Sequence, residues 1–272
     1  MLEAERHRLI LSRLKERSVA SVQDLVEILD ASEATVRRDI NGLADAGHIR
    51  RIRGGAEALT PRHETHLVGT PYALNLGMCA PQKRAIAKAA AALIEDGESI
   101  LINGGTTTCG LVEFLADKSL DILTNSLPIV TQLMAGGRHR VTLPGGTIYR
   151  EQNIVLSPFD DGALEHFWGK KLFTGCYGIN RFGLMEPDPL IVQAELKLLN
   201  RCEELVVLAD SRKLRRRSAN IVADLKRIST FITDTDATEE ELKPFRDAQI
   251  RVIRAEAGVG ASADPASQFL TY

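Results

Sequence analysis

The sequence is poor in the residues that mark several specialised classes of protein. Its four cysteines stand apart, with no Cys-x-x-Cys pair, and its six histidines show no ligand-like spacing, which argues against a zinc site and a disulfide framework. Aromatic residues make up only 5% of the chain, so Phe167, Trp168 and Phe173 are more typical of a core or a subunit contact than of a base-stacking surface. We therefore expect no metal, no cofactor and a reducing compartment.

Long hydrophobic runs and a strong net charge are also absent. No stretch reaches the ~18 uninterrupted apolar residues of a membrane span, and the opening segment 1–8 is too charged for a signal peptide. We expect a cytoplasmic protein without a membrane partner. Lys and Arg number 34 against 36 Asp and Glu, a net charge of −2. A general nucleoid or RNA-binding protein needs a broader basic surface, so any nucleic-acid contact must come from a local patch.

The remaining composition is that of an ordinary globular chain. Hydrophobic residues make up 44% and charged residues 26% of 272, which excludes disordered and fibrous classes and allows a small domain joined to a larger one. Changes in pattern along the chain predict the organisation. We expect a DNA-binding domain at 1–59, a linker rich in Pro and Gly at 60–81, a larger domain at 82–255 and a flexible tail at 256–272.

The first domain has the pattern of a winged helix-turn-helix. Apolar spacing predicts a helix at 3–17, a second at 22–29 and a third at 33–46, which Ser32 can cap and Gly47 can end. Two short helices with a tight turn between them, followed by a β-hairpin over 48–59, are typical of this motif.

The third helix and the hairpin carry side chains suited to DNA. Five arginines and two aspartates between positions 37 and 53 give this window a net charge of +3 in a chain of net −2. Arginine can clamp a guanine edge, Thr and Asn can reach bases or phosphates, and helix-start amides bind phosphate. The alternative is a small solvated bundle with ordinary surface arginines. The residues expected to contact DNA are Ser32, Thr35, Arg37, Arg38, Asn41, Arg50, Arg51 and Arg53.

Beyond the linker, helices alternate with short apolar strands. This order predicts an α/β fold with a parallel sheet and helices on both faces. The expected helices cover 83–93, 107–115, 127–134 and 191–202, and the expected strands 99–102, 121–125, 140–143, 171–177 and 205–210.

Polar turns follow four of these strands and predict a ligand pocket. A Gly-rich turn at 103–108 offers free amides and hydroxyls to an anion such as phosphate, although a plain turn with a Thr cap and no ligand would have the same sequence. Carboxyl ends of parallel strands lie at one edge, so the turns should converge. Glu195 and Lys197 are two apart on a helix, so only one should face the pocket. The residues expected to bind the ligand are Asn103, Gly104, Gly105, Thr106, Thr107, Thr108, Asn125, Ser126, Gly145, Gly146, Glu195, Lys197, Asp210 and Lys213.

The runs 32–43 (SEATVRRDINGL) and 47–56 (GHIRRIRGGA) resemble the signature of the DeoR family of bacterial transcriptional regulators. The resemblance extends to about residue 254 through the 103–107 loop, the Glu-x-Lys helix and the segment LADSRK at 208–213. It implies a sugar-phosphate sensor domain with a fold related to ribose-5-phosphate isomerase.

The resemblance also carries expectations about function. It implies a repressor of a sugar or sugar-acid operon, released from its double-stranded operator by a phosphorylated sugar, and the similarity to ascorbate-utilisation regulators suggests L-ascorbate 6-phosphate. Paired half-sites predict a homodimer or homotetramer. Asp39 should be structural and hold a neighbouring arginine. Many family members have Asp where this chain has Asn103, which changes what the loop accepts.

An enzyme is the main alternative to a regulator. Glu195, Asp210 and Lys197 are groups that a sugar-phosphate isomerase with an accessory DNA-binding domain could use for proton transfer. Asn103 is uncharged, however, and the sequence places no second carboxylate beside it. We therefore expect no catalytic residues.

Overall fold

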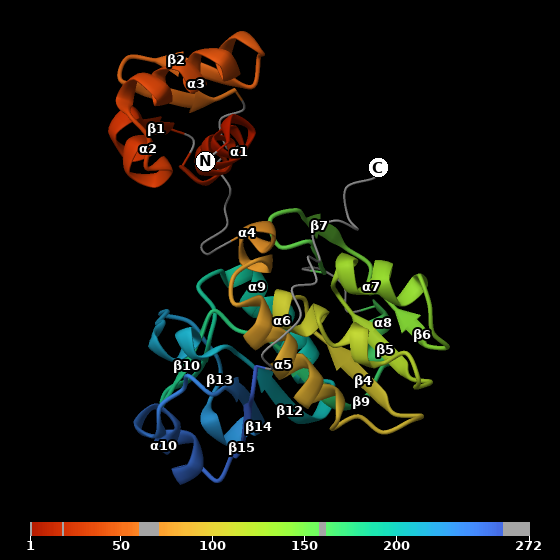
Figure 1. Cartoon of the computed structure of the whole chain (residues 1–272). Coiled ribbons are helices and arrows are strands. Elements are labelled where there is room, and N and C mark those ends of the chain that lie inside the picture. The colour runs from red at the N-terminus through yellow and green to blue at the C-terminus, as the bar shows by residue number, and fades with distance from the viewer. Residues whose placement is uncertain (1, 18, 60–70, 158–161, 258–272) are drawn as a thin grey trace. The chain divides into compact units, whose positions relative to one another are not determined.

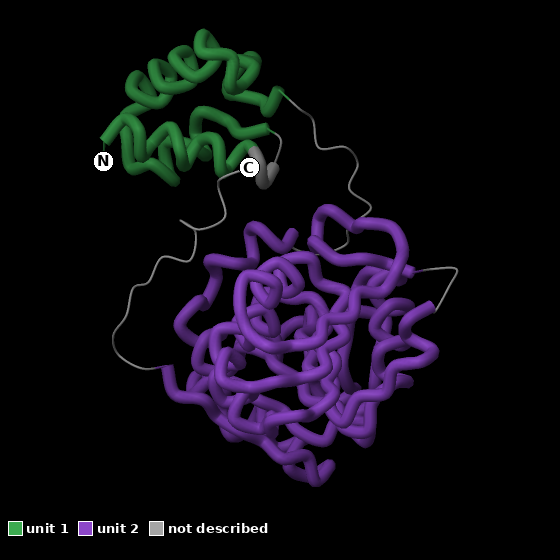
Figure 2. Tube along the Cα trace, turned by 90° about the vertical axis from the view of Figure 1, so that its right-hand side faces the viewer, with its two compact units in different colours: residues 1–66 green, residues 67–272 purple. Residues whose placement is uncertain are grey.

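The computed structural model describes residues 2–17, 19–59, 71–157 and 162–257. The chain divides into two compact units, residues 1–66 and 67–272 (Figure 2). Residues 60–70 of the expected linker and 258–272 of the expected tail lie outside the described part. The linker prediction is wrong in its second half, because residues 72–76 form a helix and the next helix begins at Ala80.

Unit 1 has the winged helix-turn-helix architecture predicted from the sequence (Figure 1). The three strands form an antiparallel sheet in the order β1-β3-β2. Its elements are α1 (Glu3–Arg17), β1 (Val19–Ser21), α2 (Val22–Leu29), α3 (Glu33–Asp45), β2 (Ile49–Ile52) and β3 (Gly55–Ala58).

Local signals in the sequence explain where these elements begin and end. Ser21 and Asp24 form a capping box at the start of α2, and Gly47, at φ +73°, adopts the left-handed conformation after α3. Strand β3 lies against β1 so closely that a Cβ on Gly55 would be 2.1 Å from the Ala20 carbonyl oxygen. Only glycine fits at that position of the wing.

Unit 2 is built on a parallel sheet. Within the described residues seven strands pair in the order β15-β14-β12-β9-β4-β5-β6, all in parallel. The sheet strands are β4 (Ser99–Ile102), β5 (Asp121–Thr124), β6 (Arg140–Thr142), β9 (Gly169–Thr174), β12 (Cys202–Leu208), β14 (Ile228–Asp234) and β15 (Arg251–Ala255). The other strands are β7 (Thr147–Tyr149), β8 (Ile154–Leu156), β10 (Gly178–Asn180), β11 (Gly183–Met185) and β13 (Ile221–Ala223).

Helices and a small sheet cover the two faces of this sheet (Figure 1). The helices are α4 (Tyr72–Leu76), α5 (Ala80–Ala91), α6 (Thr106–Cys109), α7 (Leu127–Met134), α8 (Gly162–Glu165), α9 (Pro189–Leu199) and α10 (Glu239–Asp247), with 3-10 turns η1 (Val112–Phe114), η2 (Ser211–Arg215) and η3 (Leu225–Arg227). Successive strand residues face opposite sides: Leu101 and Leu205 share a core with α9, α10 and the β10-β11-β13 sheet, whereas Ile100 and Val206 share one with α5 and α7.

Several boundaries differ from the prediction for physical reasons. The expected helix at 107–115 breaks after Cys109, at Gly110, where an added Cβ would lie 3.2 Å from the Ala87 Cβ. The strand expected at 171–177 ends at Thr174. Strands β14 and β15 and helix α10 lie in a region for which the sequence pattern gave no assignment.

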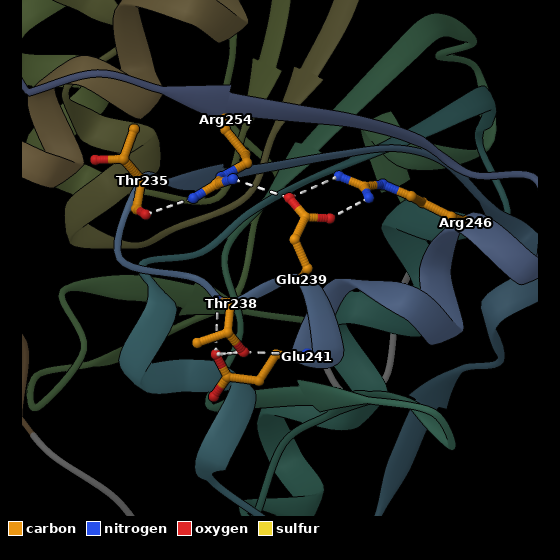
Figure 3. A network of polar contacts seen from close by, with 6 residues as sticks. All are labelled: Thr235, Thr238, Glu239, Glu241, Arg246 and Arg254. Atoms are coloured by element: carbon orange, nitrogen blue, oxygen red, sulfur yellow. Dashed lines mark hydrogen bonds and ion pairs between the residues drawn. The ribbon is translucent and has the colours of Figure 1, made fainter.

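A polar network fixes the start of α10 beside β15 (Figure 3). Thr238 and Glu241 form a capping box at the helix N-terminus. Glu239 pairs with Arg246 and, at 3.0 Å, with Arg254, whose guanidinium also donates to the Thr235 carbonyl oxygen at 2.6 Å. These groups are largely exposed, so the network orients the helix more than it stabilises the unit.

The strand order reverses between β4 and β9, and this reversal positions the site. From β4 the chain continues to β5 and β6 on one side, and from β9 to β12, β14 and β15 on the other. Open α/β sheets bind ligands outside the carboxyl ends of their strands at such a switch point. None of the helices that the structure describes has the length and apolarity of a membrane span.

Candidate functional site

Helix α3 presents a polar face outside the core of unit 1. Val36, Ile40 and Leu43 are at most 3% exposed, which leaves Arg37 and Arg38 on the outer face. The apolar spacing of the helix therefore sets the face on which its arginines lie.

The start of α3 is closed by its own side chains. The Ser32 hydroxyl accepts a hydrogen bond from the Thr35 amide at 3.2 Å and lies 2.9 Å from the Thr35 hydroxyl. Both residues thus serve as a cap, which satisfies one of the free amides at the helix start.

The predicted arginines differ in how they are held. Arg38 and Arg53 are exposed and form no hydrogen bond or ion pair with any residue that the structure describes. Arg37 pairs with Glu33 at 2.6 Å, Arg50 pairs with Glu57 at 2.7 Å, and Arg51 donates to Asn41 at 3.0 Å, which joins the wing to α3. Exposed pairs of this kind cost at most ~1 kcal/mol to break, so a phosphate can take over these guanidinium groups.

Asp39 is structural, as expected, but its partner is not a neighbouring arginine. Its carboxylate, 3% exposed, accepts hydrogen bonds from Arg6 of α1 at 2.6 and 3.0 Å. The Arg6 hydrogen bonds hold the pKa of Asp39 below its ordinary value. The pair fixes α3 against α1 and so fixes the angle at which the outer face of α3 is presented.

Glu3, His7 and Asp39 form the one group of metal-ligating side chains at suitable spacing in the described part of the chain. Both Asp39 oxygens already accept hydrogen bonds from the Arg6 guanidinium. A cationic side chain therefore takes the place that a metal ion would need beside Asp39. This arrangement is an ion-pair cluster.

In unit 2 an open polar pocket lies at the carboxyl ends of β4 and β9. It is open to solvent at its mouth and is lined mostly by polar and charged side chains. Residues 103–107 follow β4, and residues 175–177 follow β9. The site therefore occupies the switch point of the sheet. Of the predicted ligand residues, those that line it are Asn103, Gly104, Gly105, Thr106, Thr107, Glu195 and Lys213.

Asn103 organises the floor of the pocket. Its amide nitrogen donates to the Thr174 hydroxyl and to Glu195 Oε1, both at 2.9 Å, and its oxygen accepts from the Gly104 amide at 2.9 Å. Its side chain is thus committed to protein contacts and positions Glu195. An aspartate at this position would place a second carboxylate against Glu195, so the amide suits a glutamate there.

Two carboxyl groups share the pocket. Glu195 is 7% exposed, and its Oε2 is buried without a hydrogen-bond partner among the described residues. Burial, followed by the charge of Glu186, raises the pKa of Glu195 well above its ordinary value. Burial likewise raises the pKa of Glu186 to about 7. The sequence gave no signal for Glu186, and the expectation that no second carboxylate lies in this region is wrong.

Three cationic side chains line the same pocket. Burial lowers the pKa of Lys83 to about 8 and lowers that of Lys213 as well; the two are 5% and 8% exposed. The Arg216 guanidinium lies 5.3 Å from the centre of the Tyr177 ring. Burial disfavours the charged form of both carboxyl groups, so the cations favour an anionic ligand.

The remaining predicted ligand residues do not line the pocket. For the two glycines among them, the reason is their distance from the switch point of the sheet. Gly145 and Gly146 follow β6, the edge strand, two strands from β4 and roughly 10 Å away. Asn125 follows β5 and reaches only the Gly104 amide, at 2.8 Å.

Ser126 and Thr108 form side-chain hydrogen bonds with main-chain groups. Ser126 caps α7, and the Thr108 hydroxyl donates to the Gly105 carbonyl oxygen at 3.0 Å. Both are buried polar residues of the turns that frame the pocket.

Two predicted charged residues have protein partners instead. Lys197 does not line the pocket and donates to the Ser157 carbonyl oxygen at 2.6 Å, so Glu195 is the member of the Glu-x-Lys pair that lines it. Asp210 is 1% exposed and pairs with Arg212 at 2.8 Å. Burial acts to raise the pKa of Asp210, but the Arg212 hydrogen bond and charge lower it overall.

Sequence reasoning missed the pocket residues that arrive from distant segments. Lys83 is one of two lysines in an Ala-rich helix, Asn75 lies in the expected linker, and Gln152 precedes β8. Arg216 belongs to the basic run at 212–217, in which Lys213 or a neighbour is suited to contact a ligand phosphate. The run was the only signal that bore on any of these positions.

The pocket combines two chemically different kinds of group. Cationic side chains and the amides at the start of α6, which lack partners within the helix, can bind a phosphate-like anion. Glu186 and Glu195 can exchange hydrogen bonds with hydroxyl groups. A ligand with an anionic group and a hydroxylated body fits this combination.

Comparison with solved structures gives only partial likeness. Ribose 5-phosphate isomerase A from Methanocaldococcus jannaschii matches with a TM-score of 0.36 and 17% identity over 48% of this chain and 52% of that chain. The translation initiation factor eIF-2B of Pyrococcus horikoshii OT3 matches with a TM-score of 0.34 and 13% identity over 76% and 66%. Likeness at this level supports no conclusion about activity.

Sequence comparison is more informative. Residues 6–62 match the DeoR-like helix-turn-helix domain and residues 79–235 match the DeoR C terminal sensor domain. The HTH-type transcriptional regulators UlaR of Shigella dysenteriae serotype 1 and Escherichia coli O1:K1 are each 34% identical over 255 residues, 93% of this chain and 100% of theirs. The chain therefore belongs to the DeoR family of transcriptional regulators.

Proposed function

We propose that the protein is a cytoplasmic repressor of a sugar or sugar-acid utilisation operon, released from its operator by a phosphorylated sugar such as L-ascorbate 6-phosphate. The observation that carries the proposal is the pocket at the switch point. Lys83, Lys213 and Arg216 line it together with the 104–107 loop and two carboxyl groups with raised pKa values.

The DNA-binding half of the proposal rests on unit 1. Arg38 and Arg53 stand exposed without protein partners in the described residues, and Arg37, Arg50 and Arg51 are held by exposed contacts. Helix α3 in the major groove, with the wing on the neighbouring backbone, uses all five. Ser32, Thr35 and Asn41 would contribute backbone or base contacts at the same surface.

Release of DNA by the effector requires two conformers with different operator affinity. A ligand shifts them only by its differential affinity, typically ~1–3 kcal/mol of coupling. In a homodimer or homotetramer that reads two half-sites, this coupling free energy is enough to lower operator affinity, because a change in half-site spacing weakens both contacts together.

The test is operator binding by the purified full chain. Fluorescence anisotropy with DNA from its own promoter region should show specific binding that L-ascorbate 6-phosphate weakens, while unphosphorylated L-ascorbate does not. Absence of binding to this DNA at low salt would refute the DNA-binding role. Thermal shift against a panel of sugar phosphates identifies the effector, because a ligand at 100 times its Kd adds about 2.7 kcal/mol of stability.

A sugar-phosphate isomerase is the second candidate, and one observation favours it. Glu186 and Glu195 line the same pocket as Lys83 and Lys213, and a carboxylate with a pKa of about 7 is suited to proton transfer next to a carbonyl. Incubation with aldose and ketose phosphates, followed by chromatographic separation of the isomers, tests this activity. Interconversion that is lost in Glu186→Gln would establish it.

A further inference from the structure

Helix α4 is the first described element of unit 2 and forms part of the pocket wall. It begins at Tyr72, and its Asn75 lines the pocket. The Tyr72 amide donates to the Glu151 carbonyl oxygen at 2.8 Å, and its hydroxyl is hydrogen bonded to Cys109 at the end of α6. The segment that leads from unit 1 is thus attached to the pocket through α4.

One charged contact holds the C-terminal end of α4. The Lys83 ammonium donates a hydrogen bond to the main-chain carbonyl oxygen of Asn75, which also accepts from the Met78 amide at 3.3 Å. No side chain caps the N-terminus of the helix, and the helix is only five residues long. A helix this short has little stability of its own, so its geometry depends on contacts such as that of Lys83.

The end of α4 carries a polar group that the present arrangement leaves unsatisfied. Asn75 Oδ1 is buried and has no hydrogen-bond partner among the described residues. A buried acceptor without a partner costs about 1–3 kcal/mol. Any movement that exposes Asn75 to water removes this cost, so the Lys83 contact works against a local tendency of α4 to open.

Lys83 is also among the groups that an anion in the pocket would attract. It is 5% exposed, and burial lowers its pKa to about 8 despite the nearby charge of Asp210. Asp210 is itself paired with Arg212. The ammonium therefore lacks a carboxylate of its own, and a neutral carbonyl is a weaker partner for it than a phosphate oxygen.

We propose that the Lys83–Asn75 contact connects effector binding to α4: an anion in the pocket draws the Lys83 ammonium away from the Asn75 carbonyl and thereby loosens the C-terminal turn of α4. The inference rests on the proposed function, because it requires an anionic effector. It assigns Lys83 two roles, binding the anion and holding the segment that leads to the DNA-binding unit.

Hydrogen exchange of the full chain, measured by mass spectrometry on peptides covering 72–79, tests the inference. Saturation with L-ascorbate 6-phosphate should speed exchange there by about tenfold, the effect of losing one charge-assisted hydrogen bond, with no such change in peptides of α7. In Lys83→Met, exchange at 72–79 should be fast without ligand and should not respond further. Lys88→Met, an exposed lysine on the same helix, should behave as the wild type.

A second variant separates the two roles of the lysine. Lys83→Gln retains only a neutral donor for the Asn75 carbonyl, so exchange of α4 should lie between those of the wild type and Lys83→Met and should not change when ligand is added. If Lys83→Met does not fold, the wild type and Lys83→Gln still decide the matter.

The outcomes distinguish the inference from the proposed function. If the phosphorylated sugar binds the wild type and exchange at 72–79 is unchanged or slower, the inference is overturned and the proposed function stands. If neither L-ascorbate 6-phosphate, other sugar phosphates nor inorganic phosphate binds the wild type, the proposed effector function fails, and the inference fails with it.

Discussion

Replacing Asp39 with asparagine should destabilise unit 1 and leave unit 2 unchanged. The Asp39 carboxylate is 3% exposed and accepts hydrogen bonds at 2.6 and 3.0 Å from Arg6, whose side chain is 16% exposed. Asparagine has nearly the same shape, so the substitution removes one acceptor and the charge without leaving a cavity.

The magnitude follows from these contacts. Hydrogen bonds to charged groups contribute about 1.5–3 kcal/mol, whereas breaking a fully buried ion pair costs about 3–5 kcal/mol. Because the Arg6 side chain retains access to water, we expect a loss near the lower range, about 2 kcal/mol in Asp39→Asn. For a domain of this size that corresponds to a fall in Tm of roughly 8–16 °C.

The two units can be followed separately. Residues 1–66 contain no Phe, Trp or Tyr, so tryptophan and tyrosine fluorescence reports unfolding of unit 2 alone. Hydrogen exchange of peptides from α1 and α3 gives the opening free energy of unit 1. Asp45→Asn, an exposed aspartate at the end of the same helix, is the matched control.

Dependence on pH provides an independent check. The folded-state pKa of Asp39 lies below its ordinary value, chiefly because of the Arg6 hydrogen bonds. Its contribution is therefore complete above the unfolded-state pKa of about 4 and is lost as pH falls through the lower folded-state value. Asp39→Asn should lack this acid-sensitive component. Equal stability of the Asp39 and Asp45 variants at pH 7 would refute the assignment.

Three further outcomes are expected. Arg38→Ala should weaken specific operator binding by roughly 1–3 kcal/mol, measured by anisotropy; unchanged affinity would remove it from the base-reading residues. Effector affinity should fall about tenfold between pH 7 and 9, because Glu186 ionises above its pKa of about 7 and Lys83 loses its charge above about 8; calorimetry showing a flat profile would contradict this. Gly104→Ala should abolish effector binding in the same assay, because the added Cβ would lie 2.3 Å from Ile154 Cγ2 and displace the loop; wild-type affinity would show that the loop does not contribute.

Unit 1 was predictable because its signals are local. Serine caps, a 3.6-residue apolar period and a glycine after α3 lie within a few positions of the features they specify. The partner of Asp39 was not predictable in this way. Arg6 is 33 residues away, and nothing near Asp39 in the sequence distinguishes it from the adjacent arginines.

The pocket was predictable only where one strand meets its own loop. The turn after β4 carries its polar residues in sequence, and those at 103–107 line the pocket. The order of strands in the sheet decides which other turns come near, and the sequence does not state that order. Gly145 and Gly146 follow an edge strand, whereas Lys83 and Glu186 reach the pocket from a covering helix and from the loop after β11.

Gly55 restricts how the wing can diversify. Because a side chain there would collide with the Ala20 carbonyl oxygen, strand β3 is confined to one register between its two neighbours. We therefore expect variation in DNA preference at positions 50 and 51 of β2, at position 53 of the following turn, or on α3. The backbone of the hairpin is constrained, whereas the side chains at its arginine positions can change.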